Sequence, residues 1–278
     1  MRTPLHCGDR SLLLGSRTFV MGIVNVTPDS FSDGGAFMLA ADAVDHGLRL
    51  LAEGADVLDI GGESTRPGAD AVDVDVELQR VLPVIEGLAA RGVKNISIDT
   101  RHAVVAGAAL AAGAAWINDV SALDDDGMIE VARAAQALVL MHWRKAPGDH
   151  LQDHVAYDDV VAEVGSFLRS RVARACAGGI EAARIVVDPG LGFGKGVDDN
   201  LQLLAHARAF AGLGGVLVGA SRKRFLGVLA GRTGARDRDD ASVGAACAAA
   251  WAGADLVRVH AVRATVDALK VVDAVLRS

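Results

Sequence analysis

The chain has 278 residues, of which 51% are hydrophobic, 23% charged and 4% aromatic, and its formal net charge is -7. This composition is typical of a globular protein and excludes a disordered or collagen-like chain. The negative charge argues against a nucleic-acid partner, because neutralising phosphates takes clustered Lys and Arg. Barrel folds commonly reach about 250 residues as one unit, so we expect residues 1–278 to form a single domain.

The sequence shows no feature of a secreted or membrane protein. Its cysteines are isolated and form no CxxC pair: Cys7, Cys176 and Cys247. That count predicts neither a disulfide framework nor a zinc cluster. His6, Asp9 and Arg10 interrupt the segment where a secretory signal needs an apolar core, and the least charged stretch, 241–254, is too short to span a membrane. We therefore expect a soluble protein of the reducing cytoplasm.

Eight short aliphatic runs recur along the chain and read as buried strands. In order they are 19–24, 57–60, 95–98, 116–117, 138–141, 185–187, 216–218 and 256–259. Between them lie segments with helical spacing, such as Leu78, Val81, Leu82, Ile85 and Leu88, or Val262, Val266, Leu269, Val272 and Leu276. Apolar strands that alternate with amphipathic helices predict parallel strands covered by helices, here an α/β protein with a (β/α)8 TIM barrel. Segments 28–38 and 144–156 are predicted as long loops.

A polar group follows every predicted strand. In chain order these are Asn25, Asp59, Asp99, Asn118, His142, Asp188, Ser221-Arg222-Lys223, and Arg258 with His260. Each of them alone reads equally well as a helix cap or a turn residue. In a TIM barrel, however, the carboxyl ends of all strands meet at one mouth, so eight together indicate a binding site.

Two features of this set point to ligand chemistry. Asp99 and Asp188 lie directly against aliphatic runs, where an ionised carboxylate needs a partner such as a ligand with two adjacent N–H donors. The cations Arg222, Lys223, Arg258 and His260 follow the seventh and eighth strands, where such barrels often hold phosphate. A solvated charge cluster would give the same cations.

Three other motifs fail on inspection. The glycine-rich run 190–196 lacks both the spacing and the Ser or Thr of a phosphate-binding loop. His150 and His154 have no accompanying Glu and follow Pro147-Gly148, which makes the segment a loop rather than a zinc-binding helix. No nucleophile elbow or Cys-His arrangement appears, so we expect chemistry without a covalent intermediate.

Taken together, eight segments resemble the dihydropteroate synthase family, the pterin-binding sulfonamide targets of folate synthesis. They are 23–35, 59–68, 97–100, 118–121, 141–143, 188–193, 221–225 and 258–260. The resemblance implies a transferase that condenses 6-hydroxymethyl-7,8-dihydropterin diphosphate with 4-aminobenzoate, with Mg²⁺ as cofactor. It also implies a cytoplasmic homodimer formed through helices near the carboxyl terminus.

The resemblance also implies roles for individual residues. The pterin would contact Asp99, Asn118, Asp188 and Lys223, with Met141 packed on the ring and Phe193 beside it. Asn25 would hold the magnesium-diphosphate unit, and Arg258 and His260 would contact the leaving phosphates. Two loops that carry Asp29, Phe31, Thr65, Arg66 and Pro67 would form the aminobenzoate pocket, with Arg66 neutralising developing charge. The catalytic set would thus be Asn25, Arg66, Asp99, Lys223, Arg258 and His260.

The chain departs from the family pattern at two positions. Ala261 stands where the family often has Asp, and Arg224 where it often has a small residue beside the aminobenzoate site. Two alternatives therefore stay open. One is a pterin-binding barrel of the cobalamin-dependent methyltransferase kind, which the loop motif at 25–35 does not support. The other is a paralogue that binds pterin without synthase activity, a reading that Ala261 motivates.

Overall fold

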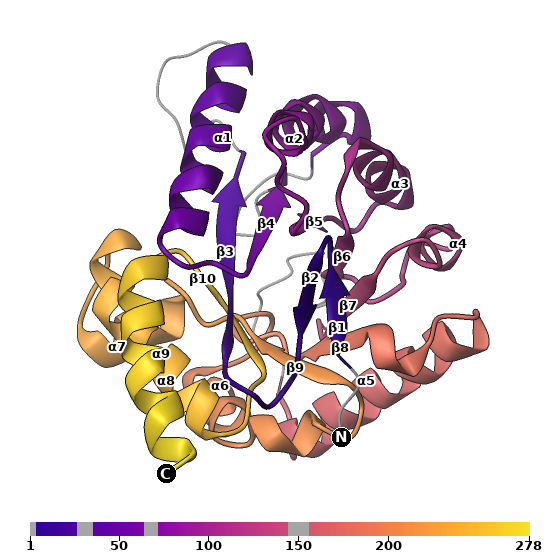
Figure 1. Ribbon diagram of the computed structural model, residues 1–278. Coiled ribbons are helices and arrows are strands. Elements are labelled where there is room, and N and C mark those ends of the chain that lie inside the picture. Colours follow the sequence, from indigo (N-terminus) through magenta and orange to yellow (C-terminus); the bar gives the residue numbers. More distant parts are fainter. Residues whose placement is uncertain (1–3, 27–35, 64–71, 144–155) are drawn as a thin grey trace.

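A computed structural model of the chain describes residues 4–26, 36–63, 72–143 and 156–278 (Figure 1). Its strands are β1 (Leu5–Cys7), β2 (Arg10–Leu12), β3 (Phe19–Asn25), β4 (Val57–Gly61), β5 (Ile96–Asp99), β6 (Trp116–Asp119), β7 (Ala137–Met141), β8 (Ile185–Asp188), β9 (Gly215–Val218) and β10 (Leu256–Val259). Its α-helices are α1 (Ala36–Ala52), α2 (Val74–Ala89), α3 (Ala103–Ala112), α4 (Met128–Ala132), α5 (Val160–Ala177), α6 (Val197–Ala205), α7 (Arg224–Ala230), α8 (Asp239–Trp251) and α9 (Val262–Leu276). Short 3-10 turns are η2 (Ala182–Arg184), η3 (Ala207–Phe210) and η4 (Arg236–Arg238).

Strands β3 to β10 form one closed parallel barrel in the order β10-β3-β4-β5-β6-β7-β8-β9. Helices surround this barrel (Figure 1). The predicted (β/α)8 fold is thereby confirmed, and each of the eight aliphatic runs coincides with one of these strands, except that β5 begins at Ile96 rather than at Asn95. The two helical stripes predicted from spacing fall in α2 and α9. The predicted loop at 28–38 is wrong at its end, because α1 begins at Ala36. Residues 28–35 and 144–155 of the two predicted loops lie outside the described residues.

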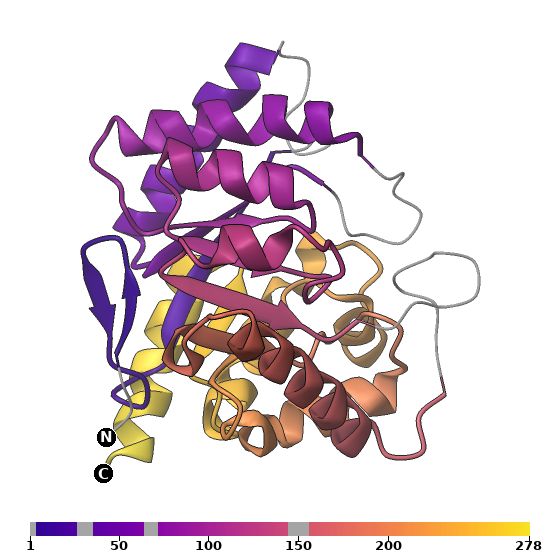
Figure 2. The ribbon, with the colours of Figure 1, turned by 90° about the vertical axis from the view of Figure 1, so that its right-hand side faces the viewer.

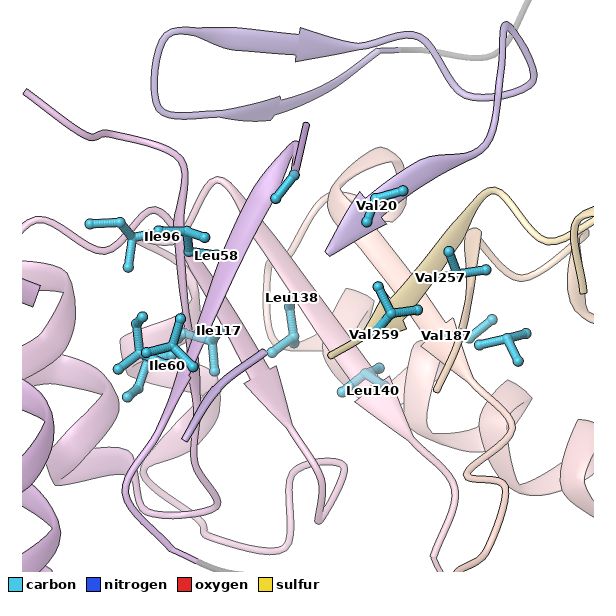
Figure 3. Close-up of a cluster of buried hydrophobic side chains, with 14 of the residues drawn as sticks. Val20, Leu58, Ile60, Ile96, Ile117, Leu138, Leu140, Val187, Val257 and Val259 are labelled. Carbon is cyan, nitrogen blue, oxygen red and sulfur yellow. The ribbon is translucent and has the colours of Figure 1, made fainter. Parts of the chain in front are cut away.

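Side chains that point outward from the barrel pack against the helices. Figure 3 shows part of this layer, in which Leu58, Ile60, Ile117 and Leu140 are fully buried. Because strand side chains alternate between two faces, the intervening residues point into the barrel. The barrel interior is therefore filled by a second and separate set of side chains.

At its amino-terminal end the barrel is closed by a β-hairpin that the sequence patterns did not predict. Strands β1 and β2 pair antiparallel, and Figure 2 shows them at one end of the barrel. Leu5, Cys7 and Leu12 join one buried cluster with interior residues such as Met21 and Trp116. The Trp116 indole N–H donates to the carbonyl of His6 over 2.6 Å. This apolar plug leaves the carboxyl-terminal half of the interior for polar residues.

Candidate active site

Polar side chains from neighbouring strands meet inside the carboxyl-terminal half of the barrel. The strand register pairs Asp59 of β4 with Ser97 of β5, and Asp99 of β5 with Asn118 of β6. Gly61 pairs with both Asn25 and Asp99, so these two residues end their strands at the same level. The predicted convergence of strand-end residues is thus a consequence of the barrel register.

The centre of this site is Arg258 of β10. Its Nε donates to Asp59 Oδ2 and its Nη2 donates to Asp99 Oδ2, both over 2.6 Å. Asn118 Nδ2 donates to the same Asp59 oxygen over 3.0 Å. One guanidinium and one buried carboxylate therefore join side chains from β4, β5, β6 and β10 into a single network.

Burial and charge act in opposite directions in this network. Burial raises the pKa of Asp99 above its ordinary value; Arg258 opposes the shift, and Asp59 adds to it. Burial alone would lower the pKa of Arg258, but Asp59 and Asp99 together raise it. Arg258 is therefore a permanent cation, while Asp99 binds a proton more readily than an exposed Asp.

Asp188, at the end of β8, occupies the opposite wall. Its Oδ1 accepts the N–H of Gly190 over 2.7 Å. Among the described residues its Oδ2 accepts no hydrogen bond, and a Cβ placed on Gly219 would lie 3.6 Å from this oxygen and 3.8 Å from Arg258 Cβ. Burial raises the pKa of Asp188, and Lys223 acts in the opposite direction. The carboxylate thus has one oxygen held by backbone and one available to a ligand.

Lys223 lies across the β8–α6 loop from Asp188. Its Nζ donates to the carbonyl of Leu191 and lies 4.5 Å from the centre of the Phe193 ring. Burial lowers the pKa of Lys223 to about 8, although Asp188 opposes the shift. Phe193 also packs with Met141 and Val120 in a small apolar cluster. The predicted pterin residues Asp99, Asn118, Met141, Asp188, Phe193 and Lys223 are therefore brought to one site.

The loop after β8 depends on glycine for its path. Gly190 and Gly192 have φ values of +67° and +80°, a region that favours glycine. A Cβ on Gly190 would lie 1.9 Å from the carbonyl oxygen of His142. The glycine-rich run therefore brings its backbone close to His142, the residue after β7.

The seventh and eighth strand ends supply the cationic side of the mouth. Ser221 Oγ lies 2.9 Å from His260 Nδ1, and the His260 N–H donates to the same hydroxyl over 3.2 Å. Arg222 has φ +60° and forms a two-point ion pair with Asp239, at 2.6 and 2.8 Å. Arg222 is thus paired with Asp239, and Arg258 with Asp59 and Asp99, whereas Lys223 contacts no carboxylate among the described residues.

The segment that carries Thr65, Arg66 and Pro67 lies outside the described residues, as do Asp29 and Phe31. The residues just before it are firmly anchored. Glu63 accepts two bonds from Arg101, at 3.0 and 2.9 Å, and the Gly62 carbonyl accepts one from Arg80 over 2.7 Å.

The sequence predicts Asn25 as a ligand for Mg²⁺. Asn25 ends β3 partly exposed at the mouth. Within the described part of the chain, no three His, Cys, Asp or Glu side chains gather as a metal-binding group. An amide oxygen nevertheless suits Mg²⁺, which keeps several waters and commonly takes only one or two protein ligands beside substrate phosphates.

Two residues that organise the site received no individual role from the sequence: Asp59 was named only among the strand-end polar groups, and Lys195 only lies within the glycine-rich run. Asp59 is fully buried and joins Arg258 to Asn118, and its position within the aliphatic run 57–60 was the available signal. Lys195 is 8% exposed, and its Nζ donates to the carbonyl of Gly190 in the β8–α6 loop. No sequence pattern marked Lys195, because its partners, two backbone carbonyls and His142, are brought together only by the folded loop.

Two cavities lie away from the strand-end network. The larger, about 580 Å³, lies between α3, α4 and the turn of the β1–β2 hairpin, and includes Gly8, Lys94 and Glu130. The smaller, about 300 Å³, lies beside the start of α5. No helix in the described residues is both long and apolar enough to cross a membrane. The smaller cavity is lined by His142 and Trp143, which follow β7, whereas none of the strand-end polar residues lines the larger one.

Comparisons with known proteins agree with this geometry. The family model for pterin binding enzymes matches residues 21–260. Mycobacterium leprae dihydropteroate synthase is 49% identical over 267 residues, which cover 93% of this chain and 94% of that one. A Xanthomonas albilineans dihydropteroate synthase solved with 4-aminobenzoic acid is 51% identical, with a TM-score of 0.92 and full coverage of both chains. A structure of the enzyme from the same organism with 7,8-dihydropteroate is 48% identical over 99% of each chain, with a TM-score of 0.87.

Proposed function

The chain belongs to the dihydropteroate synthase family of pterin binding enzymes, and we propose that it joins 6-hydroxymethyl-7,8-dihydropterin diphosphate to 4-aminobenzoate. In this reaction the bond from the pterin methylene carbon to the diphosphate oxygen breaks, and a bond to the amine nitrogen forms. The products are 7,8-dihydropteroate, diphosphate and a proton. The observation that carries the proposal is the Arg258-centred network with Asp188 and Lys223 facing one site.

The polar groups of this site match the heterocycle of a pterin. Asp188 offers an oxygen that accepts no bond from the described residues, and carboxylates suit adjacent N–H donors. Asn118 donates its amide N–H to Asp59, which leaves its carbonyl oxygen as an acceptor for a ligand. Lys223 supplies a donor for the ring carbonyl, and Met141 and Phe193 supply an apolar surface for the ring.

The leaving diphosphate builds up negative charge, so fixed cations stabilise the transition state more than the ground state. Arg258 keeps Nη1 for this purpose while Nε and Nη2 bond to carboxylates. His260, positioned by Ser221, is the second such group, and Arg66 is proposed as a third. When bound, Mg²⁺ would neutralise diphosphate charge, with Asn25 as its protein ligand.

The attacking amine needs little help from the protein. An aromatic amine is unprotonated near neutral pH, so no strong general base is required. We propose that Phe31, Thr65 and Pro67 shape the aminobenzoate pocket, and that exclusion of water prevents hydrolysis of the pterin diphosphate. Asp99 completes the proposed catalytic set by holding Arg258 and facing the pterin.

A homodimer formed through the carboxyl-terminal helices is part of the proposal. Large apolar side chains are exposed on these helices, among them Val228 of α7, Trp251 of α8, and Val271 and Val275 of α9. Helices α8 and α9 pack against each other, and we propose that exposed apolar groups on these helices form the contact between the subunits. Trp251→Glu should shift the protein to a monomer in sedimentation, whereas an unchanged mass would exclude this face. The proposed compartment is the cytoplasm, in which the three free cysteines stay reduced.

Release of diphosphate from purified protein tests the function directly. Release should require the pterin diphosphate, 4-aminobenzoate and Mg²⁺ together, with dihydropteroate formed. Asp188→Asn and Lys223→Ala should abolish pterin binding, and Arg66→Ala should mainly lower turnover. Binding of pterin diphosphate without release would show the inactive paralogue, and methyl transfer from methyltetrahydrofolate with a corrinoid partner would show the methyltransferase.

A further inference from the structure

A buried lysine lies beneath the loop that forms one wall of the candidate site. The Nζ of Lys195 contacts the carbonyl oxygens of Gly190 and Phe193 at 2.8 and 2.9 Å. It also lies 2.9 Å from Nδ1 of His142. A lysine ammonium has three N–H donors, so these three partners satisfy it completely.

We propose that Lys195 is a positioning residue for the pterin pocket, which acts through the backbone of the β8–α6 loop on Asp188 and Lys223. This inference rests on the proposed function, because it concerns how the same site is held in shape. Lys195 itself contacts neither proposed pterin group; its bonds end on the loop and on His142.

Two loop residues, Gly190 and Phe193, connect Lys195 to the two functional side chains. Gly190 accepts from Lys195 through its carbonyl and donates to Asp188 Oδ1 through its N–H. Phe193 likewise accepts from Lys195, and its ring lies under the ammonium of Lys223. Asp188 therefore bonds to Gly190, and Lys223 lies on the ring of Phe193. Lys195 holds the backbone carbonyl of both of these loop residues.

The loop also needs an internal anchor because its sequence cannot supply a rigid one. Gly190, Gly192 and Gly194 all have positive φ, and glycine restricts the backbone least. Asn200 fixes the middle of the loop by accepting the N–H of Gly192 over 2.6 Å and donating to the carbonyl of Lys195 over 3.2 Å. Lys195 holds the carbonyls of Gly190 and Phe193 on either side of Gly192, so these two side chains anchor the loop at several points.

If Lys195 only filled space, an apolar residue would do so without the free-energy cost of burying an ammonium. Burial lowers the pKa of Lys195 to about 7, and Lys223 acts in the same direction, while Asp188 and Asp199 oppose the shift. No carboxylate among the described residues contacts its Nζ. Burying an ammonium is costly unless its hydrogen bonds are fully satisfied, and here the satisfied bonds are those that shape the pocket.

The test compares Lys195→Met with Lys270→Met, which makes the same change at an exposed surface lysine. We expect Lys195→Met to raise the KM for pterin diphosphate at least tenfold and to change kcat less than threefold. The KM for 4-aminobenzoate at saturating pterin diphosphate should stay within twofold. Lys270→Met should match the wild type in all three values.

Titration with 6-hydroxymethylpterin measures the same pocket without turnover, and should show the same tenfold loss of affinity. If the wild type forms no dihydropteroate, the proposed function fails, while this titration still decides the role of Lys195. Lys195→Gln keeps a donor and should recover part of the affinity, and it replaces the Met variant if that variant does not fold. Unchanged pterin affinity, equal losses for both substrates, or failure of both variants to fold would overturn the proposal.

Discussion

Replacing Asp59 with Asn tests whether the buried carboxylate organises the site. Its Oδ2 accepts from Arg258 over 2.6 Å and from Asn118 over 3.0 Å, and the side chain is fully buried. The Asn oxygen can still accept both bonds, but without the negative charge. The second oxygen of Asp59 has no partner among the described residues, so the new amide group would also lack one.

The expected loss follows from these contacts. Bonds to a charged group contribute roughly 1.5–3 kcal/mol and neutral ones about 1 kcal/mol. Two weakened bonds and one unsatisfied donor, offset by the smaller cost of burying a neutral group, give a loss of ~2–3 kcal/mol in the free energy of unfolding. Removing the side chain entirely, as in Asp59→Ala, should cost about 3–5 kcal/mol, because Arg258 then loses a buried partner.

Urea unfolding followed by circular dichroism measures both values. Asp267→Asn is the matched control, because Asp267 is an exposed residue paired only with Lys270 in the described structure. The control should change stability by less than ~0.5 kcal/mol. If Asp59→Asn were as stable as its control and bound pterin normally, the buried network would not organise the site.

Three further changes have definite expected outcomes. Pterin affinity of the wild type should fall as pH rises through about 8, where Lys223 loses its proton. Lys223→Arg should remove this loss of affinity at high pH. If the loss persists in the variant, another group causes it. Gly190→Ala should destabilise the fold by more than ~2 kcal/mol and abolish pterin binding, because φ at Gly190 is positive and a Cβ there would collide with the His142 carbonyl. In chemical denaturation the control Gly212→Ala should match the wild type, because a Cβ at Gly212 has no atom within 4 Å. Ala261→Asp should raise the free energy of unfolding by ~1 kcal/mol in the same assay, because Ala261 precedes α9 and offers no side-chain cap. No gain would show that the first N–H groups of α9 already have partners.

The departures from the family pattern now have physical consequences. Ala261 cannot cap α9, which follows directly after His260. Arg224 is exposed at the first residue of α7, next to Lys223. Neither residue contacts the Arg258 network through any bond in the described structure. Ala261 directly follows His260 and Arg224 directly follows Lys223, so we expect their effect on the reaction to act through these two neighbours.

Local sequence patterns were sufficient to predict the barrel. Continuous apolar runs of strand length, and helical spacing between them, depend on neighbours in the chain, so the eight strands could be located from the sequence. The N-terminal hairpin could not, because β1 and β2 have three residues each and gain their stability from the barrel floor, through contacts such as Trp116 with His6.

The candidate residues of the site could be named from the sequence, but their partners could not. Position at a strand end follows from the local pattern, which is why Asp99, Asn118, Asp188, Lys223 and Arg258 could be named in advance. Which charge neutralises which depends on barrel closure, since β10 lies beside β3 and brings Arg258 to residues 199 and 159 positions earlier in the chain. Such pairings are set by register and distance in three dimensions, and only the tertiary structure decides them.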